Sequence, residues 1–221
     1  MTAITPIDLA NLSMKGGSAK TGATRNYPLR RAGSSEPVLW YPGPGAWSPV
    51  VFEPRPYGPG HEAGTRVNLV IRPSDAFMSE VARLETWAQE LFKHCPSLLD
   101  RPSADLNFNS RLKRPEGFPG NLTLKINLPG DPHPCKVWSE AGVLTAPPPE
   151  WRRCEVVPVI WVRSFYAGRS DYGLTLDCES MVVREIPDVF PLLMSVKDGS
   201  AQQDAQQALA TVPVFNQSKL F

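Results

Sequence analysis

The sequence predicts a mainly β fold, in which one helix is inserted into a small antiparallel barrel. The first observation is a set of short segments in which apolar and polar residues alternate. The second is a content of 24 prolines and 16 glycines, which favours short strands and turns over long helices. The third is one stretch with helical spacing of its apolar residues, flanked by alternating segments. Short strands around one inserted helix favour a barrel over a sandwich.

Length, charge and cysteine content limit the function classes. The 221 residues are 42% apolar, which is enough for one substantial core. The net charge is +1, so an anion-binding surface must be local. No segment has the apolar length of a membrane span or of a secretory signal, so we expect an intracellular protein of the cytoplasm or nucleus of its host cell. Four scattered cysteines suit reduced thiols and leave a disulfide open.

Residues 1–36 are predicted to form a basic flexible arm. Glycine, serine and alanine dominate this segment, and such a composition cannot bury enough apolar surface to offset the entropy of ordering. Two interpretations remain open, an arm that contacts nucleic acid or a partner subunit, and a plain flexible terminus. Its cations are Lys15, Lys20, Arg25, Arg30 and Arg31, against Asp8 and Glu36.

Residues 37–190 are predicted to form the barrel domain. The proline-rich segment 37–64 allows short edge strands at 38–41 and 49–53. The alternation in RVNLVIR predicts a half-buried strand at 66–72. Three further strands are expected at 121–128, 155–164 and 172–184, with a short one in CKVWSEAG. Residues 191–221 are predicted to be a flexible C-terminal tail.

The helix is predicted at 76–95. Its apolar residues recur at intervals of three and four, which places them on one face. Ser74 and Asp75 offer N-cap oxygens, and Pro96 ends the helix. The opposite face is expected to be polar and includes Glu85. The apolar residues of the stripe are Phe77, Val81, Leu84, Ala88, Leu91 and Cys95.

The sequence gives little support to catalysis, a cofactor or a metal site. The three histidines are far apart, and no nucleophile, zinc, Walker or dinucleotide motif is present. Asp177 and Glu179 should share one strand face, which we expect to be solvated. A small nuclease that uses these two carboxylates and Asp171 is the enzymatic alternative.

Cations and aromatic residues interleave through the second half of the sequence. Binding of a single strand without sequence preference needs cations along the phosphates and aromatic faces for the bases. One base stacked on an aromatic ring contributes roughly 1–3 kcal/mol. The sequence therefore predicts a nucleic-acid interface, whose candidate residues are Arg111, Lys113, Arg114, Lys125, Lys136, Trp138, Trp151, Arg152, Arg153, Trp161, Arg163, Phe165, Tyr166 and Arg169.

Spacing along the predicted strands groups some of these candidates. Lys136 and Trp138 are two residues apart, so they share a strand face. By the same rule Trp161, Arg163 and Phe165 should form one surface for bases and phosphates. The segment VVPVIWV has few polar positions, so burial of this strand on both faces is the alternative.

Four segments together resemble OB-fold single-stranded-DNA-binding proteins of phages and large DNA viruses. They are RVNLVIRPSDAFMSEVARLETWAQELF, LTLKINLPG, CEVVPVIWVRSF and YGLTLDCESMVVRE. The resemblance covers about residues 66–186 and implies a five-stranded OB barrel that coats single strands during replication or recombination. It implies a role for Lys125 in the LKI strand, Trp161 in the IW position, and Tyr172 and Gly173 at the start of the final strand.

The same resemblance implies partners. Single-stranded DNA is the expected ligand, with RNA possible, and the protein is expected to be a homo-oligomer. Replication proteins are expected partners of the C-terminal tail, although this tail lacks the strongly acidic character of the family. The alternative is a viral capsid or nucleocapsid subunit that self-assembles through its N-terminal arm.

Overall fold

The computed structural model describes residues 4–14, 19–21, 24–56, 65–95, 98–99, 105–114, 116 and 119–186. The described part is mainly β and contains one α-helix, as predicted. Residues up to Glu185 belong to one compact unit, and a second unit begins at Ile186. The predicted tail, 191–221, lies outside the described residues.

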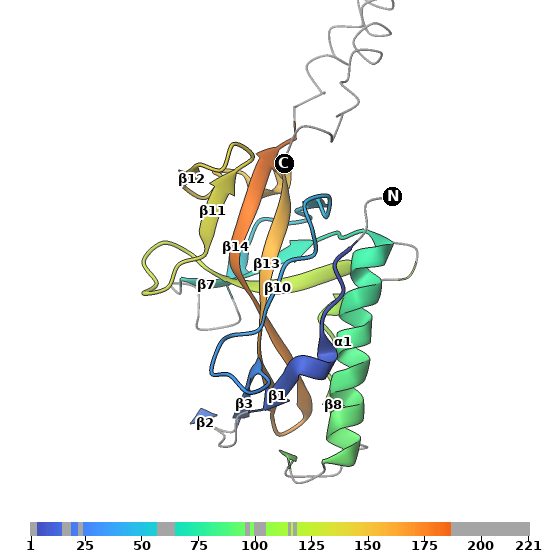
Figure 1. Ribbon diagram of the computed structural model, residues 1–221. Helices are drawn as coiled ribbons and strands as arrows, with labels where there is room; N and C mark the ends of the chain where they lie inside the picture. The colour runs from blue at the N-terminus through green and yellow to red at the C-terminus, as the bar shows by residue number, and fades with distance from the viewer. Residues whose placement is uncertain are drawn as a thin grey trace, which may run out of the picture. The chain divides into compact units, whose positions relative to one another are not determined.

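A long antiparallel hairpin forms the centre of the sheet. Its strands are β13 (Cys154–Ala167) and β14 (Asp171–Glu185), and they pair along their whole length (Figure 1). Valine and isoleucine dominate the first half of β13, and such β-branched residues favour strands. The free edge of β13 pairs with β3 (Thr24–Arg31), β4 (Leu39–Trp40) and β5 (Ser48–Pro49). The other edge of β14 pairs with β8 (Asn107–Phe108), β10 (Asn121–Asn127) and β11 (Lys136–Ser139).

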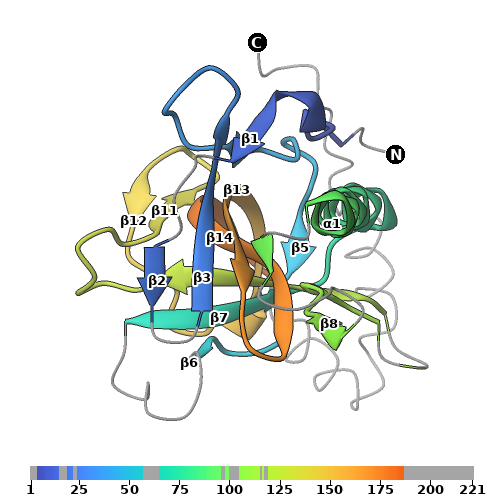
Figure 2. The same cartoon turned by 90° about the horizontal axis from the view of Figure 1, so that it is seen from below.

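The remaining elements extend this frame. Strand β10 also pairs with β7 (Arg66–Ile71), and both cross the central hairpin at a steep angle (Figures 1 and 2). Alternation buries Val67, Leu69 and Ile71 of β7 as predicted. The short elements are η1 (Leu9–Asn11), β1 (Leu12–Met14), β2 (Ala19–Thr21), β6 (Arg55–Pro56), β9 (Leu112–Lys113), β12 (Leu144–Thr145) and η4 (Trp151–Arg153).

The predicted mainly β class is confirmed, whereas the predicted barrel is not. The main path of the sheet runs from β1 to β6 without returning to its start, so a closed five-stranded barrel is not confirmed. The prediction of purely antiparallel strands is wrong at one edge, since β8, β10 and β11 all run parallel to β14. Alternation reports which face of a strand is buried and carries no information about the direction of its neighbour.

The single helix, α1 (Asp75–His94), confirms the predicted one. The Ser74 hydroxyl accepts a hydrogen bond from the Phe77 N–H at 3.3 Å, which is the predicted N-cap. The buried face of α1 packs on the hairpin, where Phe92 meets Phe165 edge to face at 5.2 Å between ring centroids. The helix therefore covers one side of the sheet and closes the core (Figure 2).

Glu85 departs from the expected polar face of α1. Its side chain is buried, and its carboxylate accepts hydrogen bonds from the Ser110 hydroxyl at 2.6 Å and the Arg111 N–H at 2.5 Å. Burial raises the pKa of Glu85, and these hydrogen bonds oppose the rise. Helical spacing identifies the apolar face, whereas the loop that covers Glu85 comes from residues far away in the sequence.

The prediction of a flexible arm over residues 1–36 is wrong for strand β3. Residues 25–28 pair with residues 164–167 of β13, and Tyr27 and Leu29 are buried in the core. The Tyr27 hydroxyl donates a hydrogen bond to the Leu98 carbonyl at 2.7 Å. The average composition of residues 1–36 does not reveal this short strand, because only Tyr27 and Leu29 alternate on its buried face. Burial of these two side chains stabilises the strand.

We expect the substitution Leu29→Ala to lower the free energy of unfolding by about 2–4 kcal/mol, because Leu29 has no exposed surface. Chemical denaturation monitored by tryptophan fluorescence measures the change. Leu144→Ala is the control, since Leu144 is 58% exposed and its truncation should change stability by less than about 0.5 kcal/mol. Equal effects of the two substitutions would contradict the placement of β3 in the core.

Candidate nucleic-acid interface

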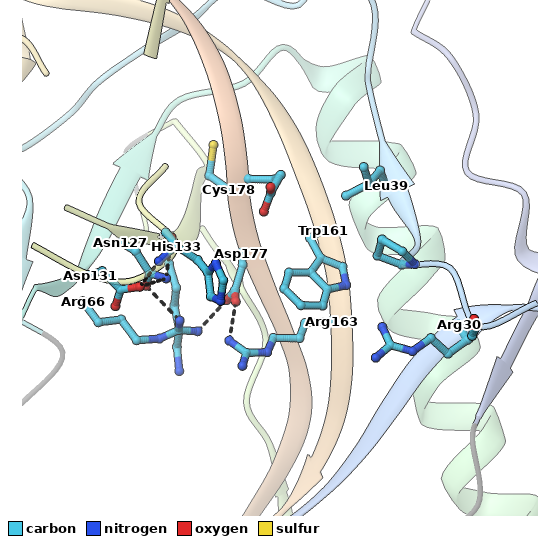
Figure 3. A pocket seen from close by; sticks show the side chains of 14 residues that line it. Arg30, Leu39, Arg66, Asn127, Asp131, His133, Trp161, Arg163, Asp177 and Cys178 are labelled. Carbon is cyan, nitrogen blue, oxygen red and sulfur yellow. Dashed lines mark hydrogen bonds and ion pairs between the residues drawn. The ribbon is translucent and has the colours of Figure 1, made fainter. Parts of the chain in front are cut away.

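A groove on the hairpin gathers cations around one tryptophan. Its volume is about 570 Å³, which lies within the usual range for ligand sites in proteins. We call it the Trp161 groove (Figure 3). Its walls and floor consist of Arg30, Ser35, Pro37, Leu39, Arg66, Lys125, Asn127, Asp131, His133, Trp161, Arg163, Asp177, Cys178 and Glu179.

Six strands, β3, β4, β7, β10, β13 and β14, contribute residues to this lining. Trp161 and Arg163 come from β13 and Asp177 from β14, while β10, β7 and β3 contribute further cations. In Figure 3, Arg66, Asn127, Asp131 and His133 lie on one side of Asp177, and Trp161, Leu39 and Arg30 lie on the other. The groove therefore runs across the hairpin and reaches the turns on both sides.

Asp177 holds the centre of the groove. One carboxylate oxygen accepts from Arg66 at 2.7 Å, and the other accepts from Arg163 at 2.9 Å. Arg66 also donates to the Asn127 side-chain oxygen at 3.0 Å. The prediction of a solvated face is wrong for Asp177, which is 7% exposed, because neighbouring strands and their arginines cover it. Its charge fixes the directions of two guanidinium groups.

Lys125 lies beside this carboxylate on the neighbouring strand. It is opposite Asp177 in the parallel register, and its side chain is buried and lines the groove. Burial, as the largest cause, and the positive charges of Arg111, Arg66 and Arg163 together lower the pKa of Lys125 to about 7. The charge of Asp177 opposes this change. The groove lining holds four basic side chains, Arg30, Arg66, Lys125 and Arg163, and three carboxylates, Asp131, Asp177 and Glu179.

Trp161 is the aromatic surface of the groove. Its side chain is half-buried, and the guanidinium carbon of Arg163 lies 5.1 Å from its ring centroid. The indole N–H is buried and has no acceptor within the described part of the chain. Across the groove Arg30 comes from β3, and no carboxylate of the described residues pairs with its guanidinium. The ring therefore lies between two cations.

Phe165 does not share the outer face with Trp161, so this part of the prediction is wrong. Val162 pairs with Leu176 and Ser164 pairs with the next residue, Thr175, which makes Arg163 an extra residue in β13. This β-bulge shifts the alternation by one position, so Phe165 enters the core with no exposed surface. It packs against α1 and cannot stack on a base.

Three further candidates are structural. Trp151 is 6% exposed and belongs to the core. Arg111 is buried, and its side chain donates to the Leu174 carbonyl at 2.8 Å. The Arg111 guanidinium also lies over the Tyr166 ring, and the Tyr166 hydroxyl donates to Asp171 at 3.2 Å. Burial raises the pKa of Tyr166, which keeps its hydroxyl protonated. The prediction that Trp151 and Arg111 face nucleic acid is wrong because both are buried, whereas for the half-buried Tyr166 it stays a prediction.

The other candidates lie outside the groove lining. Lys136 is exposed and Trp138 half-buried, and the buried Val137 between them confirms that they share a face of β11. The remaining candidates are exposed cations on η4, β9 and the turns, namely Lys113, Arg114, Arg152, Arg153 and Arg169. Of the fourteen predicted residues, the groove thus brings together Lys125, Trp161 and Arg163.

The sequence analysis missed Arg30, Arg66 and His133 as parts of this surface. Arg66 was predicted on the outer face of a strand. The sequence does not show that this residue pairs with Asn127 of β10, which places it at the groove. Arg30 was assigned to the arm. His133 lies in the turn between β10 and β11, where its N–H donates to Asp131 at 2.9 Å.

Two wider features of the described residues bear on function. No group of three or more histidine, cysteine or acidic side chains is arranged to hold a metal ion within the described part of the chain. The helix α1 is not apolar enough to cross a membrane, and the described residues contain no other candidate span.

The low pKa of Lys125 predicts a pH dependence of stability. The pKa falls from 10.5 in the unfolded chain to about 7 in the folded one, so the unfolded state binds more protons between these values. The free energy of unfolding of the wild type should therefore rise, relative to Lys125→Met, as the pH increases from about 7 to 10. At pH 6, where Lys125 is charged in both states, the advantage of Lys125→Met should be largest, with an upper limit of about 5 kcal/mol. Urea denaturation of both proteins at several pH values measures the difference, and a constant difference would contradict the burial of a charged Lys125.

No protein-family model and no curated protein matches this chain.

Proposed function

We propose that the chain binds single-stranded DNA through the Trp161 groove, without sequence preference and without catalysis. Single-stranded RNA also presents phosphates and unpaired bases, so we propose it as a second ligand. The observation that carries the proposal is a half-buried tryptophan in a groove lined by four basic residues. Coating of single strands in replication or recombination is the role that we infer from this binding.

The groove offers both kinds of contact that such a ligand needs. A base can stack on Trp161, which contributes roughly 1–3 kcal/mol for any base because every base has a π face. Arg163 already lies over this ring, and its planar guanidinium can stack in the same layer. Arg30 lines the groove on the Trp161 side of Asp177 and Arg66 on the other side, and both supply N–H donors for phosphate oxygens.

The arrangement of the strands supports an OB-like barrel as the frame of the groove. A closed barrel requires segment 48–51 to form hydrogen bonds with β13 on one side and β7 on the other, and both kinds of bond are present. The Val50 N–H donates to the Cys154 carbonyl at 2.9 Å, and the Val51 N–H donates to the Val70 carbonyl at 2.8 Å. We propose that the barrel consists of five strands, namely segment 48–51, β7, β10, β14 and β13. Helix α1 packs against this barrel.

The volume of the groove limits what one copy can hold. A groove of about 570 Å³ accommodates roughly one nucleotide. Useful affinity for a long strand then requires contacts outside the groove or several copies on one strand. This supports a homo-oligomer or a row of copies as the DNA-bound form. Exposed cations such as Lys136 and Arg169 are available for the additional phosphate contacts.

The alternatives lack comparable support. A structural subunit that exchanges its N-terminal arm would need a segment that β3 already uses, because residues 25–28 pair with β13 of the same chain. The nuclease alternative needs Asp171 and Asp177 to meet at one place. Asp177 is engaged by two arginines, and Asp171 accepts hydrogen bonds from Tyr166 and Asn109.

Substitutions in the groove should weaken binding of fluorescent oligo-dT. We expect Trp161→Ala to reduce affinity about 10-fold through loss of a stacked base, and Arg30→Ala about 3- to 10-fold through loss of a phosphate contact. Fluorescence anisotropy measures both. Neither side chain forms an ion pair with the groove carboxylates, so the fold should persist.

The matched control is Arg152→Ala, which removes an exposed cation outside the groove lining. Its affinity should stay within about 3-fold of the wild type, because a single distant phosphate contact contributes little. If Trp161→Ala and Arg30→Ala both bind oligo-dT as tightly as the wild type, the groove is not part of the binding surface.

Binding should also discriminate strandedness and respond to salt. We expect tighter binding of oligo-dT than of a duplex of equal length, with quenching of tryptophan emission, since only an unpaired base can reach Trp161. The logarithm of the affinity should fall linearly with the logarithm of salt concentration as phosphate counterions are released. Equal binding of both forms, or no quenching, would argue against stacking on Trp161.

A further inference from the structure

Two cysteines meet beside the Trp161 groove, and one of them, Cys178, belongs to its lining. The sulfur atoms of Cys135 and Cys178 lie 3.9 Å apart, although the residues are 43 positions apart in the sequence. Cys178 belongs to β14 and directly follows Asp177, while Cys135 immediately precedes β11. Both are free thiols. The parallel pairing of β11 with β14 brings them together, so their proximity is a property of the sheet.

The surroundings of the pair favour a disulfide over a metal site. The sulfur atoms of a disulfide are about 2.05 Å apart, so closure requires an approach of about 2 Å, which side-chain rotation and small backbone shifts can supply. A metal would need further ligands of the same kind, and the described residues hold no such group of three. We propose that Cys135 and Cys178 are a peroxide-sensitive thiol pair that forms a reversible disulfide within one chain.

The two thiols differ in accessibility, which sets the order of the steps. Cys135 is half-buried, whereas Cys178 is 4% exposed. Burial raises the pKa of the Cys178 thiol, and the neighbouring Cys135 raises it further, so Cys178 stays protonated. Hydrogen peroxide therefore reacts first at Cys135.

The chemistry balances with one peroxide. The Cys135 sulfur attacks a peroxide oxygen and the O–O bond breaks, which gives a sulfenic acid and one water. The Cys178 sulfur then attacks the sulfenic sulfur. An S–S bond forms, the S–O bond breaks, and the hydroxyl leaves with the Cys178 proton as a second water. The two thiols lose two electrons, and these electrons reduce the peroxide. An added dithiol reverses the change by thiol–disulfide exchange.

The disulfide would act on one wall of the groove. The Cys135 N–H donates to the Asn127 carbonyl at 2.8 Å, and the Asn127 amide donates to Asp131 and to the His133 carbonyl. The segment between Asn127 and Cys135 carries Asp131 and His133 into the groove. A bond to Cys178 would tie this segment to the floor and hold the wall in place. The inference stands on the sulfur geometry and does not require the proposed function.

The test uses the reduced full chain, treated with hydrogen peroxide. Titratable thiols in denaturant should fall from four to two, and peptide mapping under non-reducing conditions should find Cys135 joined to Cys178. The melting temperature should rise by roughly 5–10 °C, because the bond closes a long loop, and dithiothreitol should reverse the rise. Four remaining thiols, or bonds between chains or to another cysteine, would overturn the inference.

Three variants make the result specific. Cys135→Ser should abolish both the thiol loss and the shift in melting temperature, and its half-buried position makes it a mild change. In Cys178→Ser the sulfenic acid on Cys135 has no partner and should be trapped by dimedone. Cys95→Ser, at another half-buried cysteine, should behave as the wild type. A shift that survives in Cys135→Ser would show that the oxidation occurs elsewhere.

Discussion

The pairing of β13 with β14, including its bulges, is the constraint on which the rest of the structure depends. The hairpin supplies one edge for the N-terminal strands and another for the strands that follow the helix. The bulge at Arg163 leaves Trp161 and Arg163 on the outer surface and moves Phe165 into the core. A regular strand would have put all three on one face. The bulge thus separates the surface used by the groove from the surface buried under α1.

A second bulge, in β14, also shifts the alternation of buried and exposed side chains. Val159 pairs with Ser180, and the next residue, Ile160, pairs with Cys178, so Glu179 is an extra residue in β14. Asp177 and Cys178 on one side of this bulge are both buried and both line the groove. Charge and thiol chemistry therefore occupy adjacent positions on one strand. A change of charge at Asp177 or of oxidation state at Cys178 therefore affects the same part of the Trp161 groove.

Electrostatics within the groove centre on Asp177 and Lys125. Asp177 forms ion pairs with Arg66 and Arg163, and its charge also raises the pKa of Lys125. Burial then shifts Lys125 toward its neutral form. A phosphate bound in the groove would favour the protonated form of Lys125. This effect agrees with the proposed binding of nucleic acid.

The sequence by itself determined the mainly β class, the helix with its Ser74 cap, and the buried faces of β7 and β10, because these depend on local periodicity and local hydrogen bonds. It also placed Lys125, Trp161 and Arg163 among the candidate interface residues, and these three line the groove. Only the tertiary structure decided that β3 joins the sheet, that Phe165 and Trp151 are buried, and that Arg30 and Arg66 line the same groove as Trp161. Strand direction, bulges and the meeting of Cys135 with Cys178 all arise from pairing between distant segments, and no periodicity within one segment encodes its partner.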